Sequence, residues 1–531
     1  MPRMPQAPPP GIVRGATPEA TQGRWFDCNN IRFRGGQLQP IGGHVSMSAT
    51  GTDALCRDLL TWHDNNHVRW AAIGTDTALY AFRFDTQQMY TISPAAVGAL
   101  EPPGARVGYG LADYGETAYG TSRDPADFGV QDIAATMGDR WVLDTFGEDL
   151  LVVPTQDGHL YHWSPATPDV EMAIVANAPI ANRGVVVTDQ RHVVLYGAGG
   201  DPRAVAWSDQ EDYTVWAPLV TNLAGSKQLQ TQSYAMTAIK ISNGVLIFTA
   251  NDLHLMTYVG SPYAYGIVQV ATGCGPISPR SVVAIGGFVA WPGLQTFWTY
   301  SGNVQAMPCD VQDWFFSLVN RDMIGRVFGS PNPAFSELWW DWPDEGALEN
   351  NRYVAVNYAD AQRPWTIGVR TRTAGDPTGT MDYPILAGPV PGTAPLIGCL
   401  FLHEYGWTDD GVMRADTGSV YCESGAIRLG EGDKRFHVKQ LIFDASCYCG
   451  GSGTANLQSD NLMVGYRFFL REQPFDDANE IDTGLYTQVH GGLMDMRWSA
   501  RTARMRLEAI NIDGPFAVGR PRLEVRQGGR R

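Results

Sequence analysis

An all-β fold is the fold class that this sequence of 531 residues predicts, with a β-propeller-like body and an additional antiparallel β-sandwich-type domain at the C-terminal end. Three observations predict it. The chain is rich in residues that favour pleated surfaces and turns, with 16 Trp, 21 Tyr, 59 Gly and 34 Pro. Short aromatic segments bounded by turn residues recur along most of its length, and the C-terminal part alternates strictly between apolar and polar residues.

The short segments are typical of strands separated by turns. Each is rich in Val, Tyr, Phe and Trp, and each is bounded by Gly, Asp, Asn or Pro. The best examples are residues 77–84, 158–164, 191–197, 243–250, 295–302 and 351–360.

A repeat of 40 to 50 residues relates several of these segments. Alignment of Tyr161, Trp207, Met256 and Trp298 gives steps of 46, 49 and 42 residues. The step of 81 residues from Tyr80 to Tyr161 is close to two such units. Blades of four short strands have this period, so residues 52–410 are predicted to form a propeller-like body of about seven units. An array of β-sandwiches is the alternative.

The C-terminal domain, residues 411–531, is predicted to be an antiparallel sandwich with a basic tail, and its boundary falls near 410–435. Its strands have one apolar and one polar face. Val464, Tyr466, Phe468 and Leu470 share a face; Met505, Leu507 and Ala509 alternate with Arg504, Arg506 and Glu508; Leu523 and Val525 alternate with Arg522, Glu524 and Arg526. The segment 450–461 is predicted to be a flexible connection.

Helical periodicity is scarce. Residues 309–325 are the one fair candidate, because Val311, Phe315 and Leu318 fall on one helical face, with Trp314 beside them, and Asp310 stands where it could cap the start. Two long uncharged runs, 253–279 and 281–309, are interrupted by Gly and Pro. They are therefore predicted to be buried strands and turns, and no membrane span is expected.

The cysteines and the start of the chain favour assembly in a reducing cytoplasm. The eight Cys contain no CxxC pair, which favours reduced, buried thiols over a zinc site. The Pro-rich start lacks the apolar region of a secretory signal.

Charge is distributed unevenly along the chain. The formal net charge is −16, yet residues 1–34 carry five Arg against two acidic residues, and 497–531 carry nine Arg against three. An acidic body with two basic ends is expected to repel nucleic acid and to dock through its ends onto acidic neighbours. Solvated surface charge is the alternative interpretation.

Motifs for chemistry are mostly absent. There is no GxSxG, HExxH, P-loop or EF-hand sequence, and the Gly-rich segment 108–115 lacks GxGxxG spacing, so it is predicted to be a loop. His63 and His67 could share a metal on a helix, but the intervening Asn65 and Asn66 favour a turn. The sequence predicts no catalytic, cofactor-binding or metal-ligating residue, no cofactor, and no enzyme.

The segment 207–216, WSDQEDYTVW, resembles the Asp-box hairpin of sialidase-type propellers. Ser208, Asp209, Thr214 and Trp216 match in kind, although the usual Gly is missing. Such hairpins are structural, since the Asp caps its own turn and the Trp packs beneath it.

The opening segment is basic, rich in Gly and aromatic residues, and without a helical stripe. Residues 1–51 are predicted to form an interface arm and first strands, the arm packing on an adjacent subunit. The alternative is that this segment supplies the closing strand of its own propeller.

The opening segment also resembles the start of tail hub or nozzle proteins, the packaged-DNA stabilisation proteins of short-tailed bacteriophages. The likeness rests on Gly23, Arg24, Trp25, Asp27, Asn30, Arg32, Phe33, Gly35, Gly36, Gly42 and Gly43. Residues 202–218, the middle from Asn243 to Gly302, and the closing segment from Gly514 add further likeness. The acidic residue that the family usually carries in the middle is absent, since Leu253, His254 and Leu255 stand there.

This resemblance implies a structural protein of the virion, assembled in the host cytoplasm. Several copies, six in the best-known cases, would form a homo-oligomeric ring below the portal and adaptor. Tail fibre, spike or needle proteins would lie beside or below it. The ring would extend the channel, retain packaged double-stranded DNA without binding it specifically, and let it exit on infection. No catalytic residue is implied.

Two other functions fit a propeller. A carbohydrate-binding or adhesive protein could stack its many Trp and Tyr rings on sugars. A hydrolase would need a pair of carboxylates or a nucleophile that the sequence does not single out.

Overall fold

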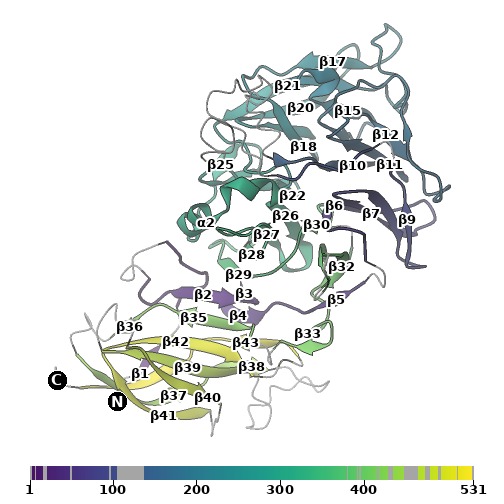
Figure 1. The fold of residues 1–531 in the computed structure, drawn as a ribbon. Helices are drawn as coiled ribbons and strands as arrows, with labels where there is room; N and C mark the ends of the chain where they lie inside the picture. The colour runs from purple at the N-terminus through teal and green to yellow at the C-terminus, as the bar shows by residue number, and fades with distance from the viewer. Residues whose placement is uncertain are drawn as a thin grey trace, which may run out of the picture.

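The computed structural model describes residues 3–5, 8–15, 21–47, 51–94, 97–103, 137–379, 381–390, 393, 396–414, 418–428, 434–447, 464–472, 479–487, 492–510, 512 and 514–528, with the backbone alone for 3–5 and 447. These residues form antiparallel sheets in two bodies, a ring of blades and a sandwich beside it (Figure 1). The all-β prediction is confirmed. The predicted loop 108–115 and the predicted connection 450–461 lie outside the described residues.

The described part of the ring has seven sheets, which we call blades. In each blade, four strands lie side by side in order from the axis outward. Blades 1 to 3 are β6 (Cys56–His63), β7 (Arg69–Thr75), β8 (Leu79–Arg83), β9 (Gln88–Thr91); β10 (Trp141–Phe146), β11 (Asp149–Pro154), β12 (Tyr161–Trp163), β13 (Ala173–Ile174); and β14 (Gly184–Val187), β15 (Val193–Tyr196), β16 (Ala204–Trp207), β17 (Gly225–Gln228).

Blades 4 to 6 follow the same order. They are β18 (Ala235–Ile241), β19 (Gly244–Thr249), β20 (Asp252–Gly260), β21 (Ala264–Thr272); β22 (Val283–Ile285), β23 (Phe288–Pro292), β24 (Phe297–Tyr300), β25 (Val304–Ala306); and β26 (Phe328–Asn332), β27 (Glu337–Trp342), β28 (Arg352–Asn357), β29 (Trp365–Val369). The two uncharged runs form β20 to β25, as strands and turns, but they are not buried throughout, since Tyr263 and Val268 are exposed.

The seventh blade closes the ring with a strand from the other end of the chain. Its first three strands are β30 (Ala374–Gly375), β31 (Ile385–Pro389) and β32 (Gly398–His403), and its fourth is β5 (His44–Ser46), beyond which lie β33 (Thr408–Asp409) and β34 (Val412–Met413). The inner strands β6, β10, β14, β18, β22, β26 and β30 contact one another in this order, and β30 returns to β6. The body is therefore a closed propeller.

The repeat in the sequence marks the third strand of the blades. Tyr80, Tyr161, Trp207, Met256 and Trp298 lie in β8, β12, β16, β20 and β24. The interpretation of the 81-residue step as two units is wrong, because β8 and β12 belong to consecutive blades. The extra length lies in the connection between β9 and β10, which is longer than the connections between the other blades.

The sandwich has three sheets, each of which mixes strands from both ends of the chain. The first sheet is β1 (Arg3–Pro5), β44 (Arg522–Gln527), β37 (Phe436–Ile442) and β41 (Leu493–Ala500). The second is β2 (Trp25–Asn29), β35 (Tyr421–Ser424), β42 (Thr502–Ala509), β39 (Val464–Arg471) and β40 (Ile481–Tyr486), with β36 (Ile427–Arg428) on β42. The third is β3 (Ile31–Arg34), β4 (Gln37–Pro40), β43 (Phe516–Val518) and β38 (Ala445–Cys447).

Strict alternation in the sequence produces the sandwich core. The apolar faces of the first and second sheets meet, so that the rings of Phe468 and Trp498 lie 5.0 Å apart. The residues that alternate with them face outward. The sandwich lies at the rim of the propeller beside β29 and β5, and both chain ends lie at its far side (Figure 1).

The predicted helix is shorter than its apolar pattern. Helix α2 covers Gln312–Leu318, and a 3-10 turn, η2, covers Arg321–Arg326. Short 3-10 turns also occur at η1 (Ala198–Gly200) and η3 (Pro333–Phe335). Asp310 does not cap α2, because its carboxylate lies 3.1 Å from Nη2 of Arg24 instead.

Candidate functional site

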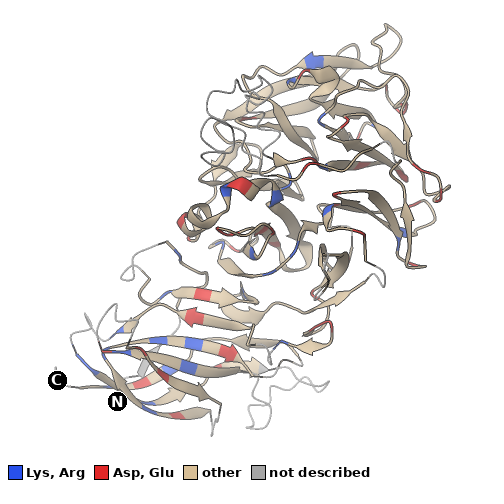
Figure 2. Ribbon diagram, in the orientation of Figure 1, with Lys and Arg blue, Asp and Glu red and all other residues tan. Residues whose placement is uncertain are grey.

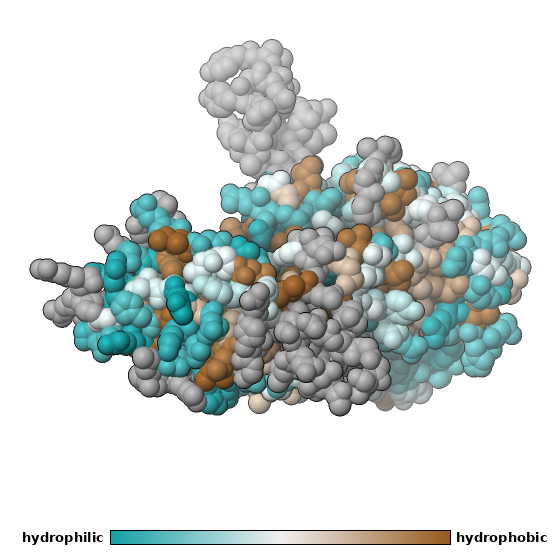
Figure 3. All heavy atoms as spheres, turned by 90° about the horizontal axis from the view of Figure 1, so that it is seen from below, coloured by the Kyte–Doolittle hydropathy of each residue, from teal (hydrophilic) through white to brown (hydrophobic). Residues whose placement is uncertain are grey.

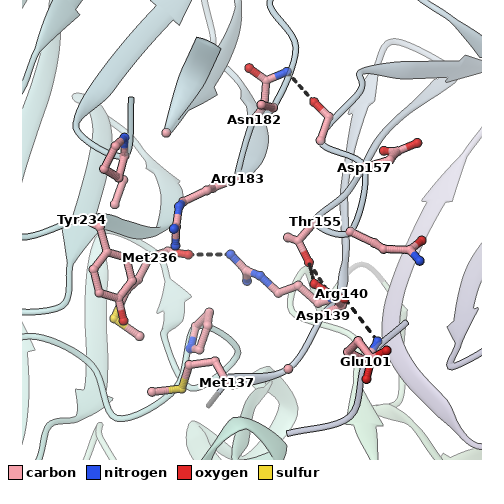
Figure 4. Close-up of a pocket in the computed structure, with 18 of the residues that line it drawn as sticks. Glu101, Met137, Asp139, Arg140, Thr155, Asp157, Asn182, Arg183, Tyr234 and Met236 are labelled. Atoms are coloured by element: carbon pink, nitrogen blue, oxygen red, sulfur yellow. Dashed lines mark hydrogen bonds between the residues drawn. The ribbon is translucent and has the colours of Figure 1, made fainter. Parts of the chain in front are cut away.

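A cavity of about 540 Å³ lies at one end of the propeller, between blades 2, 3 and 4 (Figure 4). The turns that join second and third strands, and the links that precede the inner strands, converge there. They supply the charged and aromatic lining, which includes Glu101, Asp139, Arg140, Asp157, Arg183 and Tyr234. A volume of this size is typical of a small-molecule site.

Most of the charged groups that line this cavity contact other groups of the protein. Arg140 donates from Nη2 to the carbonyl of Met236 at 2.5 Å and to the hydroxyl of Tyr196 at 3.1 Å. Asp139 accepts hydrogen bonds from the Thr155 hydroxyl and the Glu101 amide, as Figure 4 shows. These contacts join three blades, so the lining holds the mouth of the propeller in shape.

The axis of the propeller encloses a second cavity of about 530 Å³, lined by inner strands. Arg280, which precedes blade 5, reaches Asp58 in β6 with two parallel bonds of 2.7 and 2.9 Å. Asp58 also accepts the amide of Trp141 at 2.9 Å. One bidentate ion pair therefore ties blades 1, 2 and 5 across the axis.

A second arginine joins blade 1 to blade 6. Arg57 donates to Asp76 through Nε and to Glu349 through both terminal nitrogens, at 2.7 to 3.0 Å. These two carboxylates raise the pKa of Arg57 against the opposing effect of burial. Arg326 lies nearby, and burial together with the charge of Arg57 lowers the pKa of Arg326 to about 10.

The opening segment packs inside its own chain. Trp25, Ile31 and Phe33 are buried, and β2 pairs with β35 while β4 pairs with β43. The prediction of an interface arm that packs on a neighbour is therefore wrong for residues 25–40, because sheets of the same chain cover their apolar side chains. The alternative, a closing strand of its own propeller, holds for β5, which follows directly.

A buried charge cluster joins this segment to the propeller. Arg32, 1% exposed, lies 3.1 Å from Glu337 in β27 and also forms an ion pair with Glu404. Glu404 accepts the amide of Gly42 at 2.9 Å, and the Arg32 guanidinium stacks on the ring of Phe335. Burial raises the pKa of Glu337, although Arg32 opposes this effect.

Several arginines of the basic ends are neutralised within the molecule. Arg14 pairs with Asp27 at 2.8 Å, and Arg24 pairs with Asp310. On the outward side of the second sandwich sheet, arginines and carboxylates alternate across neighbouring strands (Figure 2). The pairs there are Arg467 with Asp482 and Glu508, Arg471 with Glu480, Arg504 with Glu423 and Glu480, and Arg506 with Glu508. The expectation that both basic ends are free for docking is therefore corrected for these residues.

The histidine pair lies in a hairpin turn, as its two asparagines predict. His63 ends β6, and His67 adopts a left-handed backbone with φ of 61°. The Asp64 carboxylate accepts the amides of Asn66 and Val68 and the indole NH of Trp70. No group of three His, Cys, Asp or Glu side chains that could hold a metal occurs among the residues that the structure describes.

The segment 207–216 forms the turn that its likeness predicts. Asp209 accepts the amides of Gln210 and Leu223, and Trp216 is buried beneath the turn. The turn joins the third and fourth strands of blade 3.

The described cysteines are free thiols. Cys28, Cys56, Cys274, Cys399 and Cys422 are buried, and Cys309 is half-buried. Burial raises the pKa of Cys28 to about 12 and that of Cys274 to about 11. These thiols therefore stay protonated near neutral pH.

Helices long and apolar enough to span a membrane do not occur in the described part of the chain. Seen from below, the surface is hydrophilic over most of the sandwich end, and its hydrophobic residues form small separate groups (Figure 3).

Comparison with solved structures finds two propeller domains and one bacterial surface component. The WD40 domain of Pan2 from Neurospora crassa has a TM-score of 0.37 at 10% identity, with 69% of this chain and 95% of that chain covered. The β-propeller domain of Cps50 (Swd1) from Myceliophteria thermophila also has a TM-score of 0.37, at 8% identity over 68% and 99%. PorZ of the Porphyromonas gingivalis type-IX secretion system has 0.36 at 7% identity over 75% and 44%.

Neither the family models nor the curated proteins contain a match to this chain. The propeller assignment therefore rests on the sheet order described above, and the comparisons assign no function.

Proposed function

We propose that this protein is a structural component of a bacteriophage tail, a hub or nozzle subunit that forms a ring below the portal and adaptor. The observation that carries the proposal is the opening segment. The residues that resemble the start of tail hub proteins are the ones that fasten the propeller to the sandwich, through β2, β3 and the Arg32 cluster.

The interior of the molecule supports a structural role. The charged groups in the mouth cavity contact backbone and neighbouring side chains, and the axial cavity is crossed by the Arg280–Asp58 pair. These groups contribute to the cohesion of the blades.

The axial cavity bears on the path that we propose for DNA. Its volume of about 530 Å³ is that of a small-ligand site, and the Arg280–Asp58 pair crosses it, so it is too small for a DNA duplex. DNA would therefore pass along the axis of a ring of subunits and outside each propeller. An acidic chain of net charge −16 would avoid the phosphate contacts that slow exit.

Assembly of the purified chain tests the proposal. Light scattering and negative-stain images should show closed rings of about six chains of 58.0 kDa, alone or with a portal–adaptor complex. A strict monomer that ignores portal–adaptor complexes would contradict it. A glycan array run in parallel distinguishes the adhesive alternative, which predicts specific glycan binding by the monomer.

A further inference from the structure

The outward side of the first sandwich sheet carries cations that the fold does not use. Lys439, Arg497, Arg522 and Arg526 are exposed, and none forms an ion pair with a carboxylate among the described residues. They alternate with buried apolar residues that face the core: Val438, Trp498, Leu523 and Val525. We call the four exposed cations, Lys439, Arg497, Arg522 and Arg526, the cationic face.

The second sheet shows that free cations are not a general property of the sandwich. Its outward arginines Arg467, Arg504 and Arg506 all bind carboxylates of neighbouring strands. On the cationic face, Asp495 accepts a bond from Gln440 at 2.6 Å, and Glu524 is the only other carboxylate that its described strands carry. The cationic face therefore remains net positive.

Blade 2 has the opposite character. From Trp141 to Ile174 the sequence has six Asp or Glu residues and no Lys or Arg. Glu148 and Asp149 lie at the turn between β10 and β11, and the exposed Asp169 and Glu171 follow β12 at the same end of the blade. Val170, between the last two, is 58% exposed. We call Glu148, Asp149, Asp169 and Glu171 the acidic rim.

The two surfaces lie on different sides of the molecule. The sandwich adjoins the propeller at β29 and β5, in blades 6 and 7, whereas blade 2 lies across the ring from blade 6 (Figure 1). A contact between surfaces on different sides of the same chain is heterologous. Such contacts propagate from copy to copy and close into a ring when the rotation permits.

We infer that the cationic face of one copy docks on the acidic rim of the next copy. This inference rests on the proposed function and specifies the contact that builds the ring. Complementary charges set the register of such a contact and suppress other partners, while Val170 and the partly exposed Leu493 supply apolar contact on the two sides.

A second copy fits the cationic face better than nucleic acid does. The chain is acidic overall, so approach of a polyanion is repelled by the rest of the molecule. The acidic rim is a negatively charged surface, opposite in sign to the cationic face, and every other copy carries it at equal concentration.

Charge reversal tests the contact. The variant R497E/R526E should raise the protein concentration needed for ring assembly by about tenfold or more, since two attractive contacts become repulsive. The control K227E/R363E makes the same change in net charge at blades 3 and 6, away from both surfaces, and should assemble normally. Circular dichroism checks that both variants stay folded, and light scattering measures assembly.

Mixing two defective variants gives the decisive result. D169K/E171K should also fail to assemble alone, whereas an equimolar mixture with R497E/R526E should form rings in which the two variants alternate. Assembly of R497E/R526E like the control, or failure of the mixture, overturns the inference while wild-type rings leave the proposed function standing. Wild-type protein that forms no ring, either alone or with a portal–adaptor complex, overturns both.

A binding experiment with duplex DNA tests whether the partner of the cationic face is a nucleic acid instead. Loss of duplex DNA binding in R497E/R526E, with unchanged ring assembly, would assign the cationic face to nucleic acid and overturn the contact between copies. Unchanged, weak DNA binding in all variants is the expected result.

Discussion

Single arginines hold distant parts of this chain together, and each does so with more than one partner. Arg32 binds two glutamates, Arg57 binds a glutamate and an aspartate, and Arg280 binds Asp58 and the carbonyl of Gly325. A buried guanidinium needs such partners, because its charge is costly to remove from water.

Removal of the Arg32 charge tests this role. Arg32→Met should lower the free energy of unfolding by about 3–5 kcal/mol, because Glu337 and Glu404 would be left buried without their cation. Urea denaturation of the full chain measures the loss.

Arg34, two residues along β3, is the matched control, because it is exposed. Arg34→Met should change the free energy by no more than about 0.5 kcal/mol. Equal effects of the two substitutions would show that the buried cluster contributes nothing specific.

The pH dependence of the free energy of unfolding tests the raised pKa of Asp376, a buried carboxylate with no cationic partner among the described residues. Asp376 accepts hydrogen bonds from Thr61 and Thr378, and burial raises its pKa. Above the unfolded pKa of about 3.9, the unfolded chain releases the proton while the folded protein keeps it. This group therefore stabilises the fold less as the pH rises through the raised pKa.

Asp376→Asn removes that titration. Urea denaturation from pH 4 to 8 should show the difference between variant and wild type moving in favour of the variant as the pH rises, on top of a constant loss from poorer hydrogen bonding. Parallel curves for the two proteins would contradict the raised pKa.

Burial at the residue scale could be predicted, but ionic partners could not. Alternation in 464–470, 504–509 and 522–526 predicts which side chains face the core, and the structure agrees. The Arg280–Asp58 pair spans 222 residues of sequence, and no local pattern records such a distance. The sequence therefore singles out neither residue.

At the scale of elements, the opening segment connects the propeller to the sandwich. Its strands enter the second and third sandwich sheets, and the Asn29 side chain accepts the amide of Val369 at 2.8 Å at the end of β29. The sequence pattern identified strands and an unusual aromatic density, yet it gave no sign of which sheet they join, because pairing over nearly 400 residues depends on the whole topology.

Deletion of residues 1–34 should therefore prevent folding of the sandwich. Without β2 and β3, the strand β35 becomes a bare edge, and the core that Trp25 and Phe33 cover becomes exposed. The truncated chain should lose its near-ultraviolet circular dichroism signal and aggregate. A soluble truncated chain with native signal would restore the idea of a separable arm.

Two adjacent aromatic residues supply a finer comparison. Trp25→Ala should cost about 3–5 kcal/mol, because its side chain is buried in the shared core. Phe26→Ala should cost less, because this ring is half-buried and mainly stacks on the Arg14 guanidinium at 4.2 Å. Urea denaturation of both variants gives the order, and the reverse order would contradict the register of β2.

The blade repeat shows what a sequence period can and cannot locate. The aligned residues all fall in third strands, but at different positions: Trp207 packs toward the following blade, whereas Tyr161 and Met256 pack toward the preceding one. The period fails between β8 and β12, where the connection to blade 2 is longer than elsewhere. A period alone cannot distinguish a missing blade from a long connection.

At the scale of the whole molecule, the propeller and the sandwich share one apolar core. The largest cluster of buried residues includes Trp340 and Trp365 from blade 6 together with Tyr466 and Leu507 from the sandwich. Hydrogen bonds join Cys28 and Asn29 to blade 6 across the same boundary: the Cys28 thiol donates to the carbonyl of Ile367, and Asn29 accepts the amide of Val369. Neither body has a core of its own at this boundary, so neither is expected to persist alone.

The full chain, measured as a single dissociated copy, should therefore unfold in one cooperative calorimetric transition, since any assembly would add its own stability. Arg32→Met should lower the midpoint of that single transition without splitting it, because the opening segment and both bodies unfold together. Two separate transitions in the wild-type chain would show that the propeller and the sandwich fold independently. In that case the shared cluster would be a contact surface between two domains, and the opening segment would belong to the sandwich alone.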